Sequence, residues 1–426
     1  MSPSIMILFI GIFLSIIIRT FFIINGLDVA DVTKLHQMAE AILKGNNPYL
    51  LFNFANYPPI GLYIETAILF LSNLLGIPFH ILTKILPNLA DVITCFVIYK
   101  FLIKNHVKPV NASIWSLIYI LNPISIIISA AHGHIYSITS LLTLLSIYII
   151  TSNSNKSSNL LSAILLGIAI AIKPHPVMLL PLFLVYRKMN LKQTLLFLFI
   201  SLAPAIIPLI PYLWLTPHQT IVNVFGYSGI YDISYAAILR SLWHQQNAQI
   251  WLPQADQMLS LTKWTFIFGA IFLLVILSRA KDLLKSCLAV YLLFIGIYFG
   301  ISAQYLSWIL PLAILTREKM VIPFSIFGTF ALLGFYLFFG PEILFGGFWH
   351  GAAFQSKYML IYFVGNSLLW IIVLWWLIKI IKSLFFTPFK TFSPFRKKIV
   401  FLSLIVFIIS LLPILLLTFD IIKQIN

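Results

Sequence analysis

Charged residues are scarce in this chain. Only 9% of its 426 residues are Asp, Glu, Lys or Arg, whereas a soluble globular protein carries roughly 25%. Apolar residues make up 61% of the chain, and they fall in run after run of about 20 residues, the length that a helix needs to cross a bilayer. The composition therefore excludes a soluble globular protein and predicts an all-α polytopic membrane protein.

Cysteine is scarcer still. Cys95 and Cys287 are the only two, both lie in apolar runs, and neither has a Cys-x-x-Cys partner. This excludes a disulfide framework and a cysteine-based zinc site. The first apolar run, Ser4–Ile24, is followed by no small-residue cleavage site, so we expect a retained first span and not a signal peptide.

Acidic residues number only 11 against 27 basic ones, which leaves a net charge of +16. Basic residues of membrane proteins gather in cytoplasmic loops, so we attribute the surplus to topology and expect no nucleic-acid partner. Most of the basic residues form six clusters. These are Lys100/Lys104/Lys108, Lys156, Arg187/Lys188/Lys192, Arg279/Lys281/Lys285, Arg317/Lys319 and Lys379/Lys382/Lys390/Arg396/Lys397/Lys398.

A single topology places all six clusters in the cytoplasm. It has about 13 spans in one integral membrane domain over residues 1–426, with C-terminal spans over 318–426 and the N-terminus inside. If Ile60–Leu75 crossed the membrane, every later cluster would move to the outer side. We therefore interpret this run as a re-entrant or interfacial helix; the alternative is a full span with an unrecognised partner span.

Two outer loops are long. The first, residues 25–59, contains Val32–Leu43, whose apolar residues share one face of a predicted helix. The second, residues 213–262, is rich in aromatic residues and exceeds the about 15 residues beyond which loops are usually functional or disordered. Its aromatic content argues against disorder.

Polar residues in the outer segments are the candidates for chemistry. Asp28 and Asp31 are three residues apart, which places both carboxylates on one helical face; helix capping is the alternative. His132 and His134 flank a glycine at the outer end of a span, with Tyr136 beyond. No carboxylate neighbours them at a suitable spacing, so we expect no metal there.

Three further residues lie in outer turns or loops. Lys173 and His175 alternate with prolines, and ionisable groups at this depth usually mark a site, although a lysine can also snorkel to the interface. Arg240, in the second loop, has the planar donor set that binds phosphate, or it belongs to an interfacial belt. Gln304 either lines a cavity or is structural.

In chain order, these motifs resemble the GT-C glycosyltransferases, membrane enzymes that use a polyprenyl-phosphate sugar. The resemblance covers about residues 20–315. Gly45–Tyr49 and Asn56-Tyr57-Pro58-Pro59 resemble the first loop of glycosylphosphatidylinositol mannosyltransferase I and of bacterial polyprenyl-phosphate mannosyltransferases. Aligned on that loop, Asp31 falls at the family's acidic position.

Later motifs continue the resemblance. Leu89-Ala90-Asp91 is similar to a Leu-Ala-Asp stretch of the family. His132-Gly133-His134 is similar to the Asp-His-Gly-His segment of dolichyl-phosphate-glucose glucosyltransferases, although Ala131 replaces its Asp. Ile172-Lys173-Pro174 resembles the family's next outer turn, and Gln304–Pro311 resembles a late motif.

The resemblance implies a hexosyltransferase with its active site on the extracytoplasmic face of the cell membrane. A mannose or glucose unit would pass, with inversion, from an undecaprenyl- or dolichyl-phosphate sugar to a lipid or glycan acceptor. Asp31, or Asp28, would be the general base, and no cofactor or metal is expected. Partners are then the donor, the acceptor and membrane lipids. The residues expected to bind or orient the substrates are Tyr57, His132, His134, Tyr136, Lys173, His175, Arg240 and Gln304.

Other functions are compatible with many spans. A transporter or lipid flippase would favour inverted repeats with broken helices in matching halves, and the sequence contains no such repeat. A ligase or polymerase of surface polysaccharides would have a similar number of spans. A non-catalytic scaffold would leave the pattern from Asp31 to Tyr57 accidental.

Overall fold

A computed structural model gives the fold of this protein. It describes residues 2–27, 31–152, 155–243, 248–277, 282–348, 355–389 and 393–425. Within these ranges the regular structure is helical, without strands. The chain divides into two compact units, Met1–Leu180 with Met189–Tyr227 and Gly340–Gly351, and Pro181–Lys188 with Ser228–Phe339 and Ala352–Asn426.

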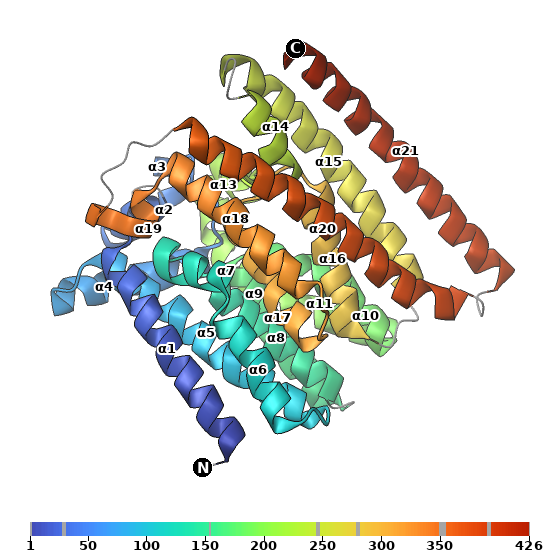
Figure 1. Cartoon of the computed structure of the whole chain (residues 1–426), viewed down its shortest axis with the longest axis horizontal. Helices are drawn as coiled ribbons and strands as arrows, with labels where there is room; N and C mark the ends of the chain where they lie inside the picture. The colour runs from blue at the N-terminus through green and yellow to red at the C-terminus, as the bar shows by residue number, and fades with distance from the viewer. Residues whose placement is uncertain are drawn as a thin grey trace. The chain divides into compact units, whose positions relative to one another are not determined.

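The first unit contains most of the N-terminal half. Its helices are α1 (Pro3–Asn25), α2 (Asp31–Leu43), α3 (Pro48–Leu51), α4 (Pro59–Leu75), α5 (Phe79–Lys104), α6 (Pro109–Ile120), α7 (Pro123–Ile126), the π-helix η1 (Ile127–His132), α8 (Tyr136–Ser152), α9 (Lys156–Ile172), η2 (His175–Leu179), α11 (Leu191–Ile206), η3 (Ile207–Leu209), α12 (Ile210–Leu215), α13 (Pro217–Phe225), α19 (Glu342–Phe345) and η5 (Gly346–Phe348). Helices α1, α5 and α6 pack against one another in this unit (Figure 1).

The second unit contains longer helices. They are α10 (Leu180–Arg187), α14 (Tyr235–Trp243), α15 (Ala248–Leu277), α16 (Leu283–Ile297), η4 (Ala303–Trp308), α17 (Ile309–Leu315), α18 (Val321–Phe339), α20 (Ser356–Phe389) and α21 (Pro394–Ile425). Helix α18 lies along α20, and α15 lies along α21 (Figure 1).

Local sequence explains many of the helix starts. Several helices of the first unit, including α1, α4 and α6, begin at a proline, whose fixed φ and missing N–H suit the first helical position. Asn155 and Asn190 cap α9 and α11 by accepting backbone N–H groups through their side chains. Pro58-Pro59 therefore begins a helix as well as ending the loop before it.

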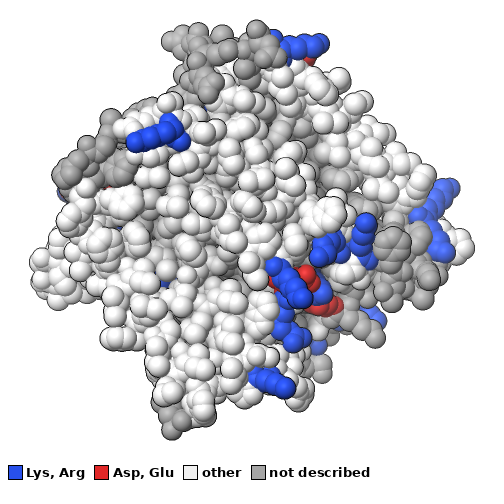
Figure 2. Space-filling view, in the orientation of Figure 1, with Lys and Arg blue, Asp and Glu red and all other residues white. Residues whose placement is uncertain are grey.

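The exterior is that of a membrane protein. Seven described helices are long and apolar enough to cross a bilayer, or eight if the bent pair Pro109–Ile120 and Pro123–His132 is one span. Six more apolar helices have 10–17 residues. The expected count of about 13 spans is thus not confirmed. Large apolar side chains such as Phe13 and Phe401 are exposed, and few charged atoms appear on the face in Figure 2.

The helix ends in the first unit follow the predicted alternation. Helix α5 ends at Lys104 and α9 begins at Lys156, both in basic clusters, while η1 ends at His132 and α9 ends next to Lys173. The helix expected for the first span (α1) and the loop helix α2 are both present, and α1 is long and apolar enough to cross a bilayer. Arg279 and Lys281 of one basic cluster and Lys390 of another lie outside the described residues.

The long loop predicted at residues 213–262 is mostly helical instead. It contains α13 and α14, and α15 begins inside it at Ala248. Gly226 and Gly229 lie in the turn between α13 and α14. A composition rich in aromatic residues does not distinguish such short helices from a loop. The placement of these residues outside the membrane stays a prediction.

Helix α4 forms as expected but stays near the predicted outer ends of its neighbours. Its Glu65 accepts a hydrogen bond from Thr83, in the first turns of α5, at 2.7 Å. A Cβ at Gly61 would lie 2.8 Å from the carbonyl oxygen of Ile172, the last residue of α9. The re-entrant or interfacial orientation of α4 in the membrane stays a prediction.

A buried ion pair between α1 and α5 lies at the centre of a polar network in the first unit. Arg19 on α1 pairs with Asp91 on α5 at 2.8 Å, and both side chains are at most 2% exposed. The same carboxylate accepts a hydrogen bond from Ser129 of η1 at 2.6 Å. Tyr119 and Ser125 also donate to Asp91. The network fixes the position of η1, which carries His132 at its end.

Candidate active site

Seven of the residues singled out in the sequence meet at one end of the first unit. Asp31 begins α2, Tyr57 precedes α4, His132 ends η1, and His134 follows it after one glycine. The list is completed by Tyr136 at the start of α8, Lys173 at the end of α9 and His175 at the start of η2. We refer to these seven residues as the Asp31 cluster. All except Asp31 are buried.

The carboxylate of Asp31 faces the two histidines. Its Oδ2 lies 3.2 Å from Nε2 of His132 and 3.8 Å from Nε2 of His134. Asp31 remains 27% exposed, while the two histidines are at most 7% exposed. One oxygen is thus held by imidazoles, and the group still has access to a molecule outside the buried cluster.

A π-helix and a glycine turn both histidines toward Asp31. Residues Ile127–His132 form the wide π-helical turn, a distortion that is rare and often found at functional sites. Gly133 follows in a left-handed conformation, with φ of 82°. A Cβ at this position would lie 2.7 Å from Cγ of Lys84. Only glycine satisfies both the backbone angle and the close approach of Lys84.

Two tyrosine rings hold the Lys173 ammonium. Its Nζ lies 3.3 Å from the ring centroid of Tyr57 and 5.1 Å from that of Tyr136. The Tyr57 hydroxyl lies 3.1 Å from Nε2 of His134, and the two rings stack. Tyr136 also contacts His175, with ring centroids 5.7 Å apart. The ammonium is therefore enclosed by aromatic faces, which attract a cation.

The charges of the cluster follow from this geometry. Burial alone would raise the pKa of Asp31, but the hydrogen bond with His132 and the charges of His132, His134 and Lys34 outweigh it and hold the pKa well below its usual range. Burial, together with the charges of Lys173 and His132, keeps the pKa of His134 well below its usual value, against the opposing charge of Asp31. Asp31 is then ionised at neutral pH.

Lys173 has an unusual charge state for a lysine. Burial lowers its pKa to about 7, against the opposing charges of Asp31 and Glu65. At neutral pH it exchanges between the ammonium and the amine. An anion bound beside it would favour the ammonium.

Two buried residues near the cluster were not singled out by the sequence. Glu65 on α4 is fully buried, and its Oε1 has no hydrogen-bond partner among the described residues. Lys84 on α5 is also fully buried and donates to the carbonyl oxygen of Gly26 at 2.7 Å. The available signal was a charged residue inside an apolar run, which usually marks a site or a buried partner.

The remaining candidates do not join this cluster within the first unit. Asp28 lies outside the described residues. Arg240 and Gln304 belong to the second unit. There the Arg240 guanidinium pairs with Asp232 at 3.0 Å and lies 4.1 Å from the ring centroid of Phe339. Gln304 is buried on η4. Phosphate binding by Arg240 stays a prediction.

The cluster also contains the donor set of a metal site. One ligand atom from each of Asp31, His132 and His134 lies within 4.8 Å of the others. No carboxylate lies near the histidine pair in the sequence, but the fold brings Asp31 to it from 101 residues away. Nε2 of His134, the ring nitrogen that faces Asp31, also lies 3.1 Å from the Tyr57 hydroxyl. The absence of metal stays a prediction.

Comparison with known proteins assigns the chain to a family. Residues 8–227 match the protein family described as GPI transamidase subunit PIG-U. Because this match covers more than half of the chain, the protein belongs to that family. The match contains the whole Asp31 cluster and ends before Arg240 and Gln304.

A curated relative carries a different description. The chain is 26% identical over 389 residues to GPI mannosyltransferase 1 of Candida albicans, an alignment that covers 83% of this chain and 91% of the relative. The resemblance to membrane glycosyltransferases is thereby confirmed. A membrane transferase and a subunit of a transamidase are thus both represented among proteins similar to this one.

Proposed function

We propose that this protein is a membrane mannosyltransferase. It would move mannose from a polyprenyl-phosphate donor to a lipid or glycan acceptor on the extracytoplasmic face, with inversion at the anomeric carbon. The observation that carries the proposal is the ionised, partly exposed carboxylate of Asp31 held against two buried histidines. The name of the Candida albicans relative favours mannose over glucose and a glycolipid over other acceptors.

Asp31 would act as the general base. The acceptor hydroxyl oxygen forms a bond to the anomeric carbon, the bond from that carbon to the phosphate oxygen breaks, and the hydroxyl proton passes to Asp31. Inverting glycosyl chemistry uses a carboxylate in this way, opposite the leaving group. A carboxylate of low pKa is a weak base, but the hydroxyl becomes strongly acidic as its oxygen bonds to the anomeric carbon. Permanent ionisation then matters more than basicity.

Lys173 would stabilise the leaving group. The departing lipid phosphate gains negative charge, and a preorganised cation in a site that excludes water stabilises such charge. The Lys173 ammonium lies inside the cluster between Tyr57 and Tyr136. His134 and Tyr57, which share a hydrogen bond, would orient the sugar through their polar atoms and their stacked rings.

The test compares the purified full chain with Asp31→Asn in detergent. Each is incubated with radiolabelled polyprenyl-phosphate mannose or glucose and a glycolipid acceptor extract. Loss of a general base reduces the rate about 100- to 10,000-fold, and we expect a loss of that size for the mannose donor. Glu40→Gln is the matched control, because Glu40 lies on the same helix, is exposed, and pairs only with the exposed Lys44 among the described residues.

Unchanged transfer in Asp31→Asn would contradict the assignment of the base. A preference for the glucose donor would contradict the proposed sugar. Transfer is also expected to persist in the presence of EDTA. If chelation abolishes it and a divalent cation restores it, then an ion between Asp31, His132 and His134 is required and the metal-free mechanism is wrong.

A second candidate function is favoured by the description of the family itself. In that case the chain would be a non-catalytic subunit of a GPI transamidase assembly, and the Asp31 cluster would bind a glycolipid without transferring a sugar. This alternative predicts that the wild type transfers no hexose from any donor and retains a glycolipid on purification. It also predicts that Asp31→Asn weakens that retention.

A further inference from the structure

A cavity separates α9 from α11 at their N-terminal ends. The two helices are in close contact at Gly167, where a Cβ would lie only 2.9 Å from the carbonyl oxygen of Ile200. Between that contact and the helix starts at Lys156 and Leu191, the helices leave a cavity of about 340 Å³. Both helices belong to the first unit.

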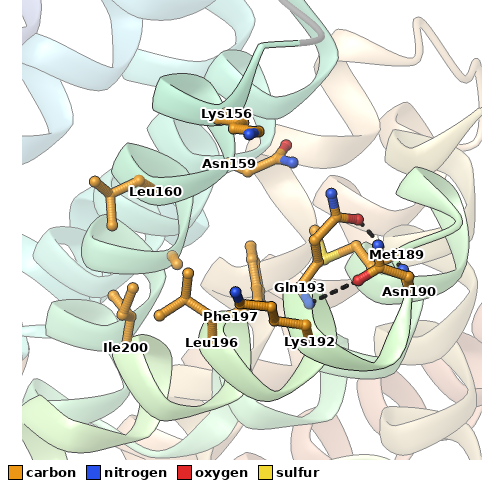
Figure 3. Close-up of a pocket in the computed structure, with 11 residues that line it drawn as sticks. Lys156, Asn159, Leu160, Met189, Asn190, Lys192, Gln193, Leu196, Phe197 and Ile200 are labelled. Carbon is orange, nitrogen blue, oxygen red and sulfur yellow. Dashed lines mark hydrogen bonds between the residues drawn. The ribbon is translucent and has the colours of Figure 1, made fainter.

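The cavity has a polar end and an apolar end. Figure 3 shows Lys156 and Asn159 of α9 across the opening from Lys192 and Gln193 of α11. Deeper along the helices, the wall is made of apolar side chains. The most prominent are Leu160, Ala163, Leu196 and Phe197. Such a division matches a molecule with a charged head and a hydrocarbon chain.

The polar end consists of cations and hydrogen-bond donors. Neither Lys156 nor Lys192 is paired with an acidic group among the described residues, and the sequence contains no Asp or Glu between Asp91 and Asp232. Asn190 and Gln193 bond each other's backbone N–H through their side-chain oxygens in a capping box (Figure 3). Their amide NH₂ groups are not used by this box and can donate to a bound anion.

The helix termini add to the positive potential. Helices α9 and α11, of 17 and 16 residues, both begin at this opening. The N-terminal end of a helix carries a partial positive charge that favours anions. Asn159 supplies a hydrogen-bond acceptor. Its buried Oδ1 has no hydrogen-bond partner in the described part of the chain. A hydroxyl group on a bound molecule would donate to it.

We propose that this cavity is a binding site for an anionic phospholipid of the cytoplasmic leaflet. The phosphate lies between Lys156 and Lys192, a headgroup hydroxyl donates to Asn159, and one acyl chain enters between Leu160 and Leu196. Basic pockets between membrane helices on the cytoplasmic side bind anionic lipid headgroups in this manner. A volume of about 340 Å³ is at the small end for ligand sites, so the remaining hydrocarbon stays in the bilayer.

The site is separate from the Asp31 cluster. Helix α9 has 17 residues, and at 1.5 Å per residue it places its ends roughly 25 Å apart. Lys156 is at one end and Lys173 follows the other. Access from the bilayer is open, because Leu160 and Leu196 are 46% and 57% exposed. The lipid can therefore enter sideways and is not the sugar donor at the outer face.

Native mass spectrometry of the full chain tests the proposal. The protein is titrated with phosphatidylglycerol and with phosphatidylcholine of the same acyl chains, and the bound fraction is measured. We expect phosphatidylglycerol to bind selectively. We expect Lys156→Gln/Lys192→Gln to weaken its binding about 30-fold, as two lysines near an anionic headgroup imply. Leu196→Trp, which fills the apolar end and keeps both lysines, should also weaken binding.

The control is Lys104→Gln/Lys108→Gln, which removes two exposed basic residues of another cluster. Unchanged phosphatidylglycerol binding in this control, with loss in the other two variants, would support the site. Equal loss in the control would mean that overall charge attracts the lipid and would overturn the proposal. If phosphatidylcholine binds as well as phosphatidylglycerol, the cavity makes only non-selective lipid contacts, and the proposal is overturned. Displacement of phosphatidylglycerol by an equimolar polyprenyl phosphate would also overturn the assigned occupant.

Discussion

Asp31 and Lys173 differ in whether their partners outweigh burial. At the Asp31 carboxylate the hydrogen bond with His132 and the nearby positive charges do so, and its pKa falls well below the usual range. The ammonium is buried between tyrosine rings, and burial lowers its pKa to about 7. The two residues therefore respond differently to pH, and this difference can be measured.

The pH dependence of transfer should report Lys173. The protonated fraction of this lysine falls as the pH rises through about 7. If the ammonium stabilises the leaving phosphate, kcat/KM for the donor falls above that pH, because kcat/KM reports the groups of the free protein. Asp31 stays ionised over the same range, so no acidic limb above about pH 5 is expected from it.

Conservative variants test this assignment. Lys173→Arg keeps a permanent charge, so the alkaline loss should disappear even if the rate is lower. Lys44→Gln, which changes an exposed lysine of the same unit, should keep the wild-type profile. An alkaline limb that survives in Lys173→Arg would belong to another group and would contradict the role of Lys173.

At the scale of elements, the π-helix η1 and its terminal glycine control the site. Gly133→Ala introduces a left-handed alanine, which costs about 1–2 kcal/mol, and also a contact with Lys84. We expect loss of sugar transfer and a lower melting temperature in detergent. Gly76→Ala is the matched control, since Gly76 has φ of 66° and open space around its Cβ. An equal effect of both variants would show that the Lys84 contact is unimportant.

The Arg19–Asp91 pair should dominate the stability of the first unit. Removing one partner of a buried ion pair costs about 3–5 kcal/mol because the other charge is left uncompensated. We expect Asp91→Asn to lower the melting temperature strongly, and Arg19→Met/Asp91→Leu to lower it by less than the sum of the single changes. Breaking the exposed Lys44–Glu40 pair with Lys44→Gln should leave it nearly unchanged. Additive losses would mean that the pair does not act as a unit.

At the scale of the whole molecule, the membrane topology can be read by cysteine labelling. Cys95 and Cys287 are both fully buried, so they should give little background with an impermeant maleimide. A cysteine at Asn46 should react from outside, and one at Asn105 only after the membrane is opened. A cysteine at Asn73, near the end of α4, decides how that helix lies. Labelling from outside is expected, whereas labelling only from inside would make α4 a full span.

Much of the architecture could be predicted from the sequence because it depends on local properties. Apolar runs and basic clusters locate α1, α5 and α9, and the periodicity of Val32–Leu43 predicts α2. The short helices within residues 213–262 could not be predicted in this way, because aromatic and Gln-rich composition does not separate a short helix from a loop.

The sequence predicted which residues belong to the candidate site but not how they are arranged in space. The sequence by itself predicted that Asp31, His134 and Lys173 lie on one side of a membrane, because charge and hydropathy act locally along the chain. Only the tertiary structure decided that Asp31 faces His132 across 101 residues and that Arg19 pairs with Asp91 across 72. Such contacts depend on how helices pack and where a π-helix turns its last side chain, and neither leaves a periodic signal in the sequence.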